Sequence, residues 1–571
     1  MSALPRIADG TPDEGRLAGE LRGALGLSRT VAAWLARRGF RDHAAARAFL
    51  EPRLQDLTDP AAMVDRELAA DRIARAVRAG ETICVYGDYD CDGITSAAIM
   101  TSVIRTLGGK VVPLLASRFE GGYGVSAAAA ERIRSSEASL LVTCDCGSSD
   151  HAVLAELTGR GVDCVVIDHH LVPDEPLPVL AFLNPNRPDC GFGFKGLASC
   201  GLALSVAAAL RKCLDKPLDL RLWLDLVAIG TIADVVPLEG DNRALTRAGL
   251  GRIARAERPG VRTLLELARF DAARNISAED VAFRIAPRLN APGRMGSPDL
   301  ALQLLLATSH DEARELGERV ERVQQERRLV QDRMLAQAIE EIERDGYAER
   351  PAIVIGRDDW NHGIVGIVAG RLVGRYGKPC VVIGFEGEHG RGSVRGPPGA
   401  RLYDALAASK EALLRFGGHQ AAAGLEVQAS RLAEFREAFA AASARMPSNG
   451  SDETNDSRLP LHPEDEPRQV LSDLERLEPC GQSNPAPRIV IDARVLSARE
   501  VRGGHLKLEL ELAPGRRIAG FAPGYSGEAP AAGSATTVYG SLRADTYRGG
   551  DAVEIRIDGF DGSARPDVAP A

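Results

Sequence analysis

The stretch Thr82–Gly93, TICVYGDYDCDG, decides the fold class of this chain. Thr82–Tyr86 is an apolar run typical of a buried strand, and a cluster of carboxylates follows it at once. The next segment, Ser96–Leu107, closes at Gly108-Gly109 and is predicted to be a helix. Further strands are expected at Val111–Ala116, Ser139–Thr143 and Cys164–Ile167. Helical stretches separate most of these strands, so the sequence predicts an α/β unit with a mainly parallel sheet.

The carboxylates after the first strand are Asp88, Asp90 and Asp92. Three acids this close together repel one another, so the arrangement is costly without a cation. A solvated acidic turn is one alternative, but such turns seldom separate a buried strand from a helix. An EF-hand loop also begins DxDxDG, but here Ile99 occupies the position of the bidentate Glu, and a strand precedes the loop instead of a helix. We therefore expect a cation site of another kind.

Acidic and imidazole side chains recur at the ends of later apolar segments. Asp145 lies just beyond the strand LLVT, Asp168-His169-His170 follows the strand CVVI, and Asp234 lies within GTIADVVPL. Ligands of open α/β sheets gather at the carboxyl ends of the strands, so these segments are expected to converge on one crevice. Asp234 would be expensive to bury unpaired. Each acid alone could be structural, but chance is a poor explanation for all of them together.

The types of ligand indicate the metal and the chemistry. Several carboxylates with one or two imidazoles and no thiolates suit Mn²⁺ or Mg²⁺ better than structural zinc. The carboxylates suffice for two ions with a bridging aspartate between them. Such a pair activates water and stabilises both the attacking and the leaving oxygen of a phosphoester displacement. The constellation therefore predicts phosphoester hydrolysis.

Length and composition set wider limits. A chain of 571 residues is expected to form three or four domains, and 45% hydrophobic with 26% charged residues is ordinary for a globular protein. The net charge of −9 excludes a general polyanion-binding protein, so any basic surface for nucleic acid must be local. The N-terminus shows no secretory signal and no run of 18 apolar residues occurs, so we expect a cytoplasmic protein without a membrane contact. The ten scattered cysteines suggest small buried side chains in a reducing compartment.

Changes in sequence texture divide the chain. Ser309 and Glu312 form a capping box ahead of a long amphipathic helix that ends near Gly346, and five short alternating segments after Pro487 suggest a small barrel of the OB type. The expected organisation is a helical region at 1–78, an α/β phosphoesterase domain at 79–308, a connecting helix at 309–346, a smaller α/β domain at 347–446, a linker at 447–467 and an OB-type barrel at 468–565.

The motifs GDYDCDG, TCDCG, VIDHH and GTIADVVPL, in this order, resemble the four motifs of the DHH phosphoesterase superfamily. Within it, ARAFLEPRLQDLTDP, SRFEGGYG, FRIAPRLNAPGRMG, NHGIVGIVAGRL, RGSVRG, FGGHQAAAG and EPCGQSNPAP resemble the RecJ family of bacterial single-strand-specific 5′→3′ DNA exonucleases. The resemblance runs from about residue 40 to 560. It implies a DHH domain, a DHH-associated substrate-binding domain and an OB-fold.

The resemblance assigns the catalytic residues. It implies two Mn²⁺ or Mg²⁺ ions held by Asp90, Asp92, Asp145, His169 and Asp234. Asp88 and His170 would be close neighbours, and His170 would orient or protonate the scissile phosphate. Cys91, Cys144, Cys480 and Ser483 depart from the usual family residues, but none of these departures removes a ligand.

The resemblance also suggests DNA contacts. Gly417-Gly418-His419, ahead of an expected alanine-rich helix that ends at Gly424, would let backbone approach a phosphate, although the segment could be a plain helix cap. Loop residues that would grip phosphates, or else be solvated surface, are Arg118, Arg294, Ser393 and Arg395. Residues that could stack on bases, or else have ordinary core or loop roles, are Tyr86 and Tyr123. Weakly supported contacts on the barrel are Arg502, His505, Lys507, Arg516 and Arg517.

The function that these features favour is a two-metal exonuclease that releases 5′ mononucleotides from single-stranded DNA in repair and recombination. One alternative is a DHH phosphodiesterase for oligoribonucleotides or cyclic dinucleotides, but those relatives generally lack the helical N-terminus and the barrel. Another is a non-catalytic DHH nucleic-acid-binding protein, although no metal ligand is lost here. Family resemblance implies a monomer that works beside a single-strand-binding protein and a RecQ-type helicase.

Overall fold

The computed structural model describes residues 12–270, 275–418, 420, 422–445, 457–525, 527–545, 548–549 and 552–560. The chain forms two compact units. Residues 58–451 make up the larger unit, and residues 1–57 combine with 452–568 to make the smaller one. The sequence suggested one helical block at 1–78, but its helices divide between the units because those before residue 58 share a core with the barrel.

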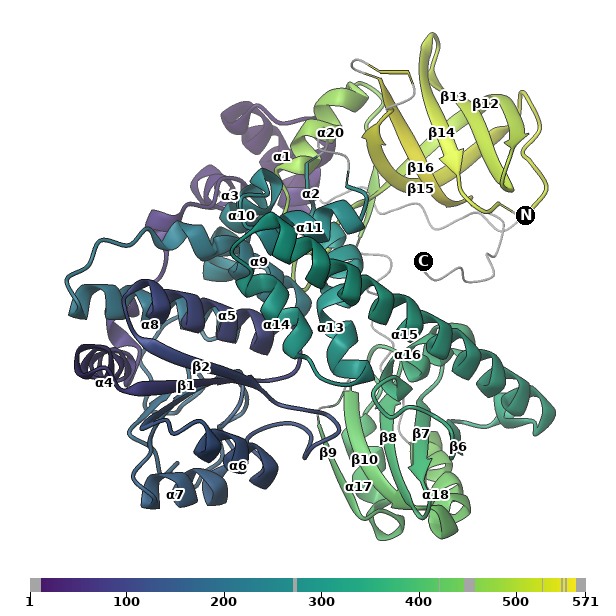
Figure 1. Ribbon diagram of the computed structural model, residues 1–571. Coiled ribbons are helices and arrows are strands. Elements are labelled where there is room, and N and C mark those ends of the chain that lie inside the picture. Colours follow the sequence, from purple (N-terminus) through teal and green to yellow (C-terminus); the bar gives the residue numbers. More distant parts are fainter. Residues whose placement is uncertain are drawn as a thin grey trace. The chain divides into compact units, whose positions relative to one another are not determined.

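The first sheet of the larger unit is parallel throughout, with strand order β2-β1-β3-β4-β5 (Figure 1). Its strands are β1 (Thr82–Gly87), β2 (Lys110–Leu115), β3 (Leu140–Cys144), β4 (Asp163–Ile167) and β5 (Ala181–Leu183). The predicted parallel α/β unit is therefore confirmed. Only β5, which is three residues long, was not expected.

Helices cover both faces of this sheet, which explains the almost continuously apolar strands (Figure 1). The two faces carry α5 (Cys91–Thr106) with α8 (Ser199–Cys213), and α6 (Ala127–Ser135) with α7 (His151–Gly159). Helix α5 begins at Cys91, before the predicted Ser96, because the Asp90 carboxylate caps it. That carboxylate accepts hydrogen bonds from the amides of Asp92 at 3.0 Å and Gly93 at 3.2 Å. The acidic cluster is thus the first turn of a helix.

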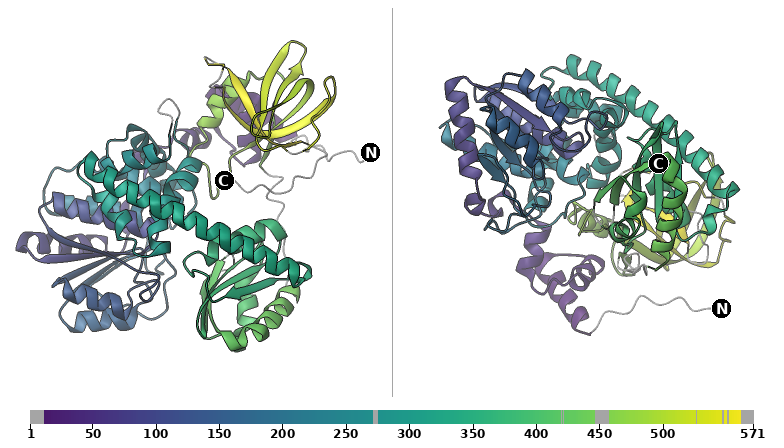
Figure 2. Two further views of the ribbon diagram at one scale, coloured as in Figure 1. Left: turned by 45° about the vertical axis from the view of Figure 1, so that its right-hand side comes forward. Right: turned by 90° about the horizontal axis from the view of Figure 1, so that it is seen from below.

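Further helices extend this domain on the side of α5 and α8. They are α4 (Arg66–Ala79), α9 (Leu224–Ala233), α10 (Gly240–Arg255), α11 (Pro259–Leu267), α12 (Ala278–Asp280), α13 (Ala286–Met295) and α14 (Asp299–Leu306). The long helix α15 (His310–Arg344) packs on α11, α13 and α14 and then continues to the second sheet (Figure 2). Ser309 caps it as predicted, accepting a hydrogen bond from the Glu312 amide at 3.2 Å. The Glu312 carboxylate accepts a hydrogen bond from the Thr308 amide and not from the Ser309 amide, so the predicted capping box is incomplete.

The second sheet has strand order β6-β7-β8-β10-β9, with only β6 and β7 parallel. Its strands are β6 (Ile353–Arg357), β7 (Cys380–Glu386), β8 (His389–Arg395), β9 (Arg415–Gly418) and β10 (Ala422–Gln428). One face packs on α15 and α16 (Val365–Tyr376), and the other on α17 (Leu402–Ala408) and α18 (Leu432–Arg445). The predicted alanine-rich helix ending at Gly424 was wrong, because this segment pairs with β8 and β9 as strand β10.

The smaller unit is a closed β-barrel with helices packed on it, which confirms the OB-type prediction. Its sheet order is β11-β12-β13-β14-β16-β15, and an additional pairing of β12 with β15 closes the barrel. The strands are β11 (Arg458–Pro460), β12 (Arg488–Val501), β13 (His505–Ala513), β14 (Arg516–Ala522), β15 (Ala535–Ala544) and β16 (Val553–Phe560). The helices are α1 (Pro12–Leu25), α2 (Arg29–Arg37), α3 (His43–Leu50) and α20 (Pro467–Glu475). In the part of the chain that the structure describes, no helix has the length and apolar character needed to span a membrane.

Candidate metal centre and phosphate pocket

The predicted metal ligands lie at the carboxyl ends of the central strands. Asp88 follows β1, Asp145 follows β3, and His169 lies just beyond β4. Asp234 caps the carboxyl end of α9, which packs against α5. Hydrogen bonds between neighbouring loops fix this convergence, because the Asp88 amide donates to the Cys144 carbonyl and the Asp145 amide donates to the Ile167 carbonyl.

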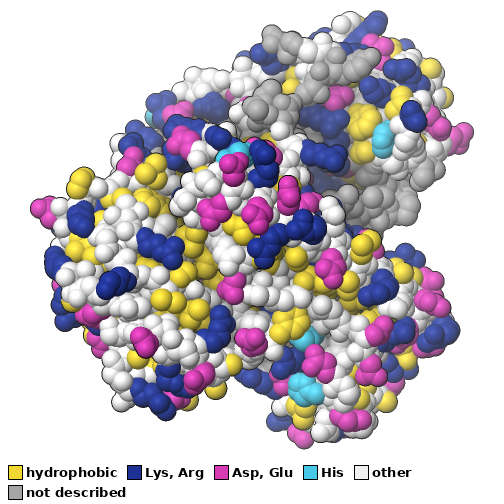
Figure 3. Space-filling model, in the orientation of Figure 1, with side chains coloured by type: hydrophobic (Ala, Val, Ile, Leu, Met, Phe, Trp, Pro, Cys, Tyr) yellow, Lys and Arg dark blue, Asp and Glu magenta, His cyan; other side chains and the backbone are white. Residues whose placement is uncertain are grey.

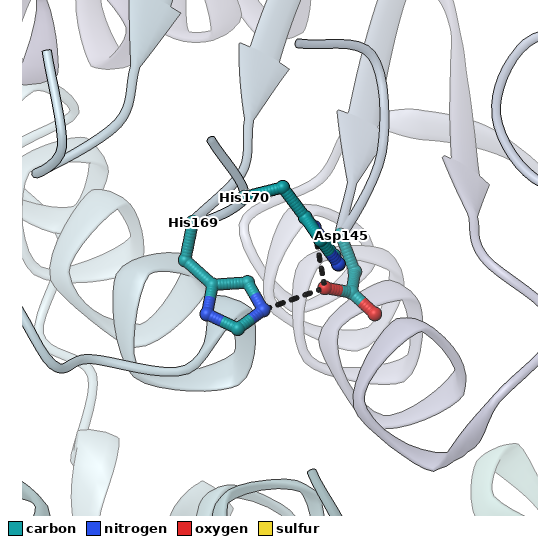
Figure 4. A group of neighbouring side chains, drawn as sticks. All are labelled: Asp145, His169 and His170. Atoms are coloured by element: carbon teal, nitrogen blue, oxygen red, sulfur yellow. Dashed lines mark ion pairs between the residues drawn. The ribbon is translucent and has the colours of Figure 1, made fainter. Parts of the chain in front are cut away.

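The side chains of these residues form one cluster. Asp145 Oδ1 lies 3.3 Å from His169 Nε2 and 3.8 Å from His170 Nδ1 (Figure 4). His169 Nε2 also lies 3.4 Å from Asp234 Oδ2. Three groups have their ligand atoms within 4.8 Å of one another: Asp92 with His169 and Asp234, Asp88 with Asp90 and Asp145, and Asp145 with His169 and His170. The structure thus brings together all seven predicted catalytic residues, with Asp145 in two of the groups.

The amino end of α8 holds two of the carboxylates, a contact that the sequence did not reveal. Asp92 accepts hydrogen bonds from the amides of Ser199 at 2.7 Å and Cys200 at 3.0 Å. The Ser199 hydroxyl donates to Asp145 Oδ1 at 3.0 Å. Ser199 therefore links the first and second motifs. Its only sequence signal was its place at the start of a helix.

Asp168 is a second residue missing from the predicted site. Its Oδ1 accepts hydrogen bonds from the His169 amide at 2.8 Å, the His170 amide at 3.2 Å and His170 Nδ1 at 2.8 Å. Burial would favour neutral forms, but this pairing outweighs it, lowering the pKa of Asp168 to about 2 and raising the pKa of His170 to about 9. The pair therefore holds a protonated imidazole beside the carboxylate cluster.

The pKa values of Asp88, Asp145 and Asp234 shift in the opposite direction. Burial first, and then mutual repulsion, raises the pKa of Asp88 and Asp145 well above the ordinary range and that of Asp234 to about 9. Two buried ligand atoms, Asp88 Oδ1 and His169 Nε2, have no hydrogen-bond partner. The carboxylates and the His169 imidazole offer oxygen and nitrogen donors, so the residues fit divalent cations of the Mn²⁺ or Mg²⁺ type.

The predicted arginines lie together beside this cluster. Arg118 lies over the ring of Tyr89 with its guanidinium carbon 3.7 Å from the centroid, and Arg294 donates to the Gly363 carbonyl at 3.1 Å. Burial, followed by repulsion from Arg118, Arg327 and Arg395, lowers the pKa of Arg294 to about 9. Within the described residues, the hydrogen bonds that Arg294 and Arg395 donate go to backbone carbonyls, and the buried Arg118 Nε has no hydrogen-bond partner. A partly buried group of such cations is suited to an anion.

Strand β8 presents Ser393 and Arg395 to the start of α16. A Cβ atom added at Gly366 would lie 3.1 Å from Arg395 Nη2 and 3.2 Å from Ser393 Oγ. The two side chains therefore share one face of β8, because residues i and i+2 of a strand point to the same side. The sequence had suggested a loop here. Arg118 reaches the same region from the first domain, since Arg391 of β8 donates a hydrogen bond to the Arg118 carbonyl at 3.5 Å.

The tyrosines differ in their placement. Tyr86 is 1% exposed, and its hydroxyl donates to the Gly124 carbonyl at 3.1 Å, so of the two roles that the sequence left open it has the core role. Tyr86 belongs to the apolar strand β1, which is covered by helices on both faces, so its side chain is buried. Tyr123 is exposed and lies edge-on to His170, with ring centroids 5.2 Å apart.

The other predicted DNA contacts are less informative. Gly417 and Gly418 are exposed on β9, and His419 lies outside the described residues. On the barrel, His505 and Lys507 alternate with buried residues along β13, and Arg502 lies in the preceding turn. Arg517 lies 3.7 Å from Glu509, whereas Arg516 binds the Asp465 carbonyl and Glu466 and so anchors the chain. On the face drawn in Figure 3, basic and acidic side chains are interspersed.

Three parts of the chain match models of known protein families. Family models match at residues 82–231 (DHH family, N-terminal domain), 349–444 (DHHA1 domain) and 459–559 (RecJ OB domain). The single-stranded-DNA-specific exonuclease RecJ of Dickeya dadantii is 36% identical over 81% of this chain and 84% of its own length. The RecJ of Bacillus subtilis is 35% identical over 85% of this chain, which spans 61% of that protein.

A solved structure extends the similarity to nearly the whole chain. The crystal structure of Thermus thermophilus RecJ in complex with Mn²⁺ has a TM-score of 0.80 and 30% identity, covering 97% of this chain and 79% of that protein. The structure of the same protein in complex with Mg²⁺ gives a TM-score of 0.74. The similarity therefore includes both α/β domains and the barrel.

Proposed function

The chain belongs to the RecJ family of single-stranded-DNA-specific exonucleases, and we propose that it removes nucleotides from the 5′ end of single-stranded DNA by metal-dependent hydrolysis. One observation carries this proposal: the four acidic motifs meet in a cluster of seven side chains, and beside it lie arginines whose hydrogen bonds, in the part of the chain that the structure describes, go to backbone carbonyls. Cations between the carboxylates would face a phosphodiester held by the arginines. The net charge of −9 agrees with such a local basic site.

The proposed metal ligands are Asp90, Asp92, Asp145, His169 and Asp234, with Asp145 between the two sites and Asp88 beside it. A pair of Mn²⁺ or Mg²⁺ ions, when bound, activates water and neutralises charge on the attacking and leaving oxygens. Ser199 and Cys200 orient two of these carboxylates through hydrogen bonds. The chain therefore supplies a rigid set of ligands before any substrate arrives.

His170 would supply a proton. Its Nδ1 is bonded to Asp168, so its Nε2–H is the donor that can point at a phosphate oxygen. Near neutral pH a pKa of about 9 keeps the ring protonated. We assign His170 to stabilising the charged phosphate and protonating the leaving oxygen, and Asp168 to positioning His170.

The direction of digestion would come from recognition of the terminal phosphate. Arg118, Ser393 and Arg395 supply two guanidinium groups and a hydroxyl, and the amino end of α16 adds its partial positive charge. Arg294 would bind the next phosphate. A 5′ phosphate in this pocket would hold the first phosphodiester at the carboxylate cluster.

Digestion of end-labelled nucleic acids tests the function directly. We expect Mn²⁺- or Mg²⁺-dependent release of 5′ mononucleotides from single-stranded DNA, little cleavage of blunt duplex, and none with a chelator. Preferred hydrolysis of cyclic dinucleotides or short oligoribonucleotides would instead identify a DHH phosphodiesterase. Binding of DNA without cleavage under every metal condition would identify a non-catalytic family member.

Replacing Arg395 tests the origin of the polarity. Arg395→Ala should lower kcat/KM on 5′-phosphorylated strands by about tenfold to hundredfold, since a charge-assisted contact contributes ~1.5–3 kcal/mol. The loss on 5′-hydroxyl strands should be much smaller at the same ionic strength. Equal losses on both substrates would place recognition of the 5′ end elsewhere.

Other family traits are further proposals for this chain. They are cytoplasmic action, a monomeric state, and work beside a single-strand-binding protein and a RecQ-type helicase. Single-strand binding by the barrel would involve the outward side chains of β13, His505 and Lys507, together with Arg502 and Arg517.

A further inference from the structure

Several exposed apolar residues lie close in sequence to the residues of the metal cluster and the phosphate pocket. Among the described residues, ten large apolar side chains are exposed, and Phe119, Tyr123, Leu171 and Val235 lie in the segments that build the site. Leu171 directly follows His170 and is 69% exposed, and Val235 directly follows Asp234 and is 64% exposed. Apolar surface beside a charged centre serves no folding purpose that the structure reveals, since neither side chain is buried.

Val235 also has a costly backbone conformation. Its φ is +60°, in the left-handed region, although β-branched residues adopt this conformation only as rare outliers. Val235 directly follows Asp234, the C-cap of α9, and glycine or asparagine would fit at this position without strain. A strained residue whose side chain contributes no core packing is best explained by a contact made to a ligand.

We propose that Val235 and Leu171 are specificity-determining residues that pack against the nucleosides flanking the scissile phosphate. The inference rests on the proposed nuclease function, because Val235 and Leu171 directly follow Asp234 and His170 of the carboxylate cluster, which would hold that phosphate. The face of an unstacked base is apolar and complements aliphatic side chains. Bases within a duplex keep their faces stacked, so this contact would favour single-stranded substrates.

Substitutions at Val235 separate a substrate contact from a structural role. Val235→Asn relieves the strain and removes the apolar side chain, so its Tm should equal or exceed that of the wild type. Its kcat/KM on single-stranded DNA should nevertheless fall roughly fivefold to thirtyfold. Val235→Ala should lose activity similarly. Ala256→Asn, at another left-handed helix end with φ +50°, should keep full activity.

Leu171 provides a second comparison. Leu171→Asn should reduce kcat/KM without lowering Tm, because the side chain is exposed. Leu222→Asn is the matched control, since Leu222 is also exposed but lies in a segment that contributes no metal ligand. It should behave like the wild type.

Abasic substrates identify the contacted group. Single strands with a tetrahydrofuran abasic nucleotide at the first or second position should be cleaved more slowly by the wild type. When the abasic nucleotide lies at the position that Val235 contacts, the wild type and Val235→Asn should have the same kcat/KM. An undiminished difference at both positions would overturn the proposal, as would full activity of the Asn and Ala variants. A fall in Tm accompanying the loss of activity in both variants would make Val235 structural, which also overturns it. Inactivity of the wild type on all single strands would contradict the nuclease function itself.

Discussion

Asp145 is a buried candidate metal ligand with a left-handed backbone conformation. It is 1% exposed, has a φ of +65°, and receives a hydrogen bond from Ser199 while lying near both histidines. Aspartate tolerates the left-handed conformation better than most residues, which suits it to this turn. Its backbone bond to β4 fixes the turn, and the carboxylate therefore lies between the groups of candidate ligands.

Replacing Asp145 separates catalysis from stability. Asp145→Ala should abolish cleavage, because the ligand shared by the candidate metal groups is lost. In chelator, its Tm should equal or exceed that of the wild type, since a carboxyl group whose pKa burial and repulsion raise is removed. Asp145→Asn, which can keep the Ser199 bond, should also be inactive. Near-normal turnover of either variant in saturating Mn²⁺ would contradict the shared-ligand assignment.

The raised carboxyl pKa values predict how metal binding depends on pH. Asp234 has a folded-state pKa of about 9 against an ordinary 3.8, so its contribution to stability is present below about pH 4 and is lost as the pH rises towards 9. Asp88 and Asp145 shift in the same direction. Metal-free protein should therefore lose stability with rising pH, and cations should restore it.

The measurement is the difference in Tm between saturating Mg²⁺ and chelator at about pH 6 and about pH 8.5. In the wild type, this difference in Tm should increase from about pH 6 to about pH 8.5. In Asp234→Asn the increase with pH should be smaller. Protons should be released on metal binding. A difference in Tm that is independent of pH would show that the cluster binds cations with its carboxylates already ionised.

The residues that the sequence revealed are those whose chemistry conflicts with their surroundings. Asp88 and Asp145 directly follow apolar strands and Asp234 lies within an apolar stretch, so these acids could be found. Ser199 could not, because a serine at a helix start is usually only a cap. Asp168 was read as part of a motif, and only its bonds to His170 reveal its role.

At the scale of elements, the phosphate pocket depends on the contact between β8 and α16. Gly366 permits close approach, since a Cβ there would crowd Arg395 and Ser393. Gly370 lies one turn later in the same helix and has no neighbouring atom within 4 Å of an added Cβ. The two glycines form a matched pair.

Alanine substitutions exploit this pair. Both variants should gain helix propensity, at most about 1 kcal/mol. Gly366→Ala should displace Arg395 and reduce the preference for 5′-phosphorylated over 5′-hydroxyl strands, by about tenfold if the contact is lost. Gly370→Ala should leave that preference unchanged. Identical ratios of kcat/KM in both variants would mean that the α16–β8 contact does not shape the pocket.

Elements were predictable where local pattern and tertiary structure agree. The strands β1, β3 and β4 are apolar and buried on both faces, and their positions matched the sequence. The alanine-rich segment at β10 was misread, because alanine favours helix locally while pairing with β8 and β9 decides the outcome. Helix α5 started early because a cap at Asp90 overrode the expected loop.

At the scale of the whole molecule, the smaller unit is built from both ends of the chain. Its core contains Leu21 and Trp34 from the N-terminal helices together with Val470 and barrel residues such as Ile489. Asp465 accepts hydrogen bonds from the Arg29 and Thr30 amides at 3.0 and 2.7 Å, so it caps α2. Partners more than 430 residues apart cannot be inferred from one sequence, which explains the undivided N-terminal block that was expected.

This arrangement predicts opposite outcomes for two truncated proteins. A fragment of residues 58–445 keeps the larger unit and every candidate metal ligand, so it should melt cooperatively and cleave short single strands in the presence of Mn²⁺. A fragment of residues 1–445 retains α1 to α3 but lacks the barrel and the Asp465 cap. Its helices should expose their apolar face, bind the dye ANS and aggregate, because a lost cap costs about 1 kcal/mol and the lost core considerably more.

Both fragments should show a raised KM on long strands with kcat largely kept, if the barrel binds single-stranded DNA. Circular dichroism, ANS fluorescence and kinetics on short and long strands would compare them with the full chain. A monomeric 1–445 fragment with folded N-terminal helices would show that these helices are stable without the barrel. The N-terminal helices would then contact the barrel without depending on it to fold.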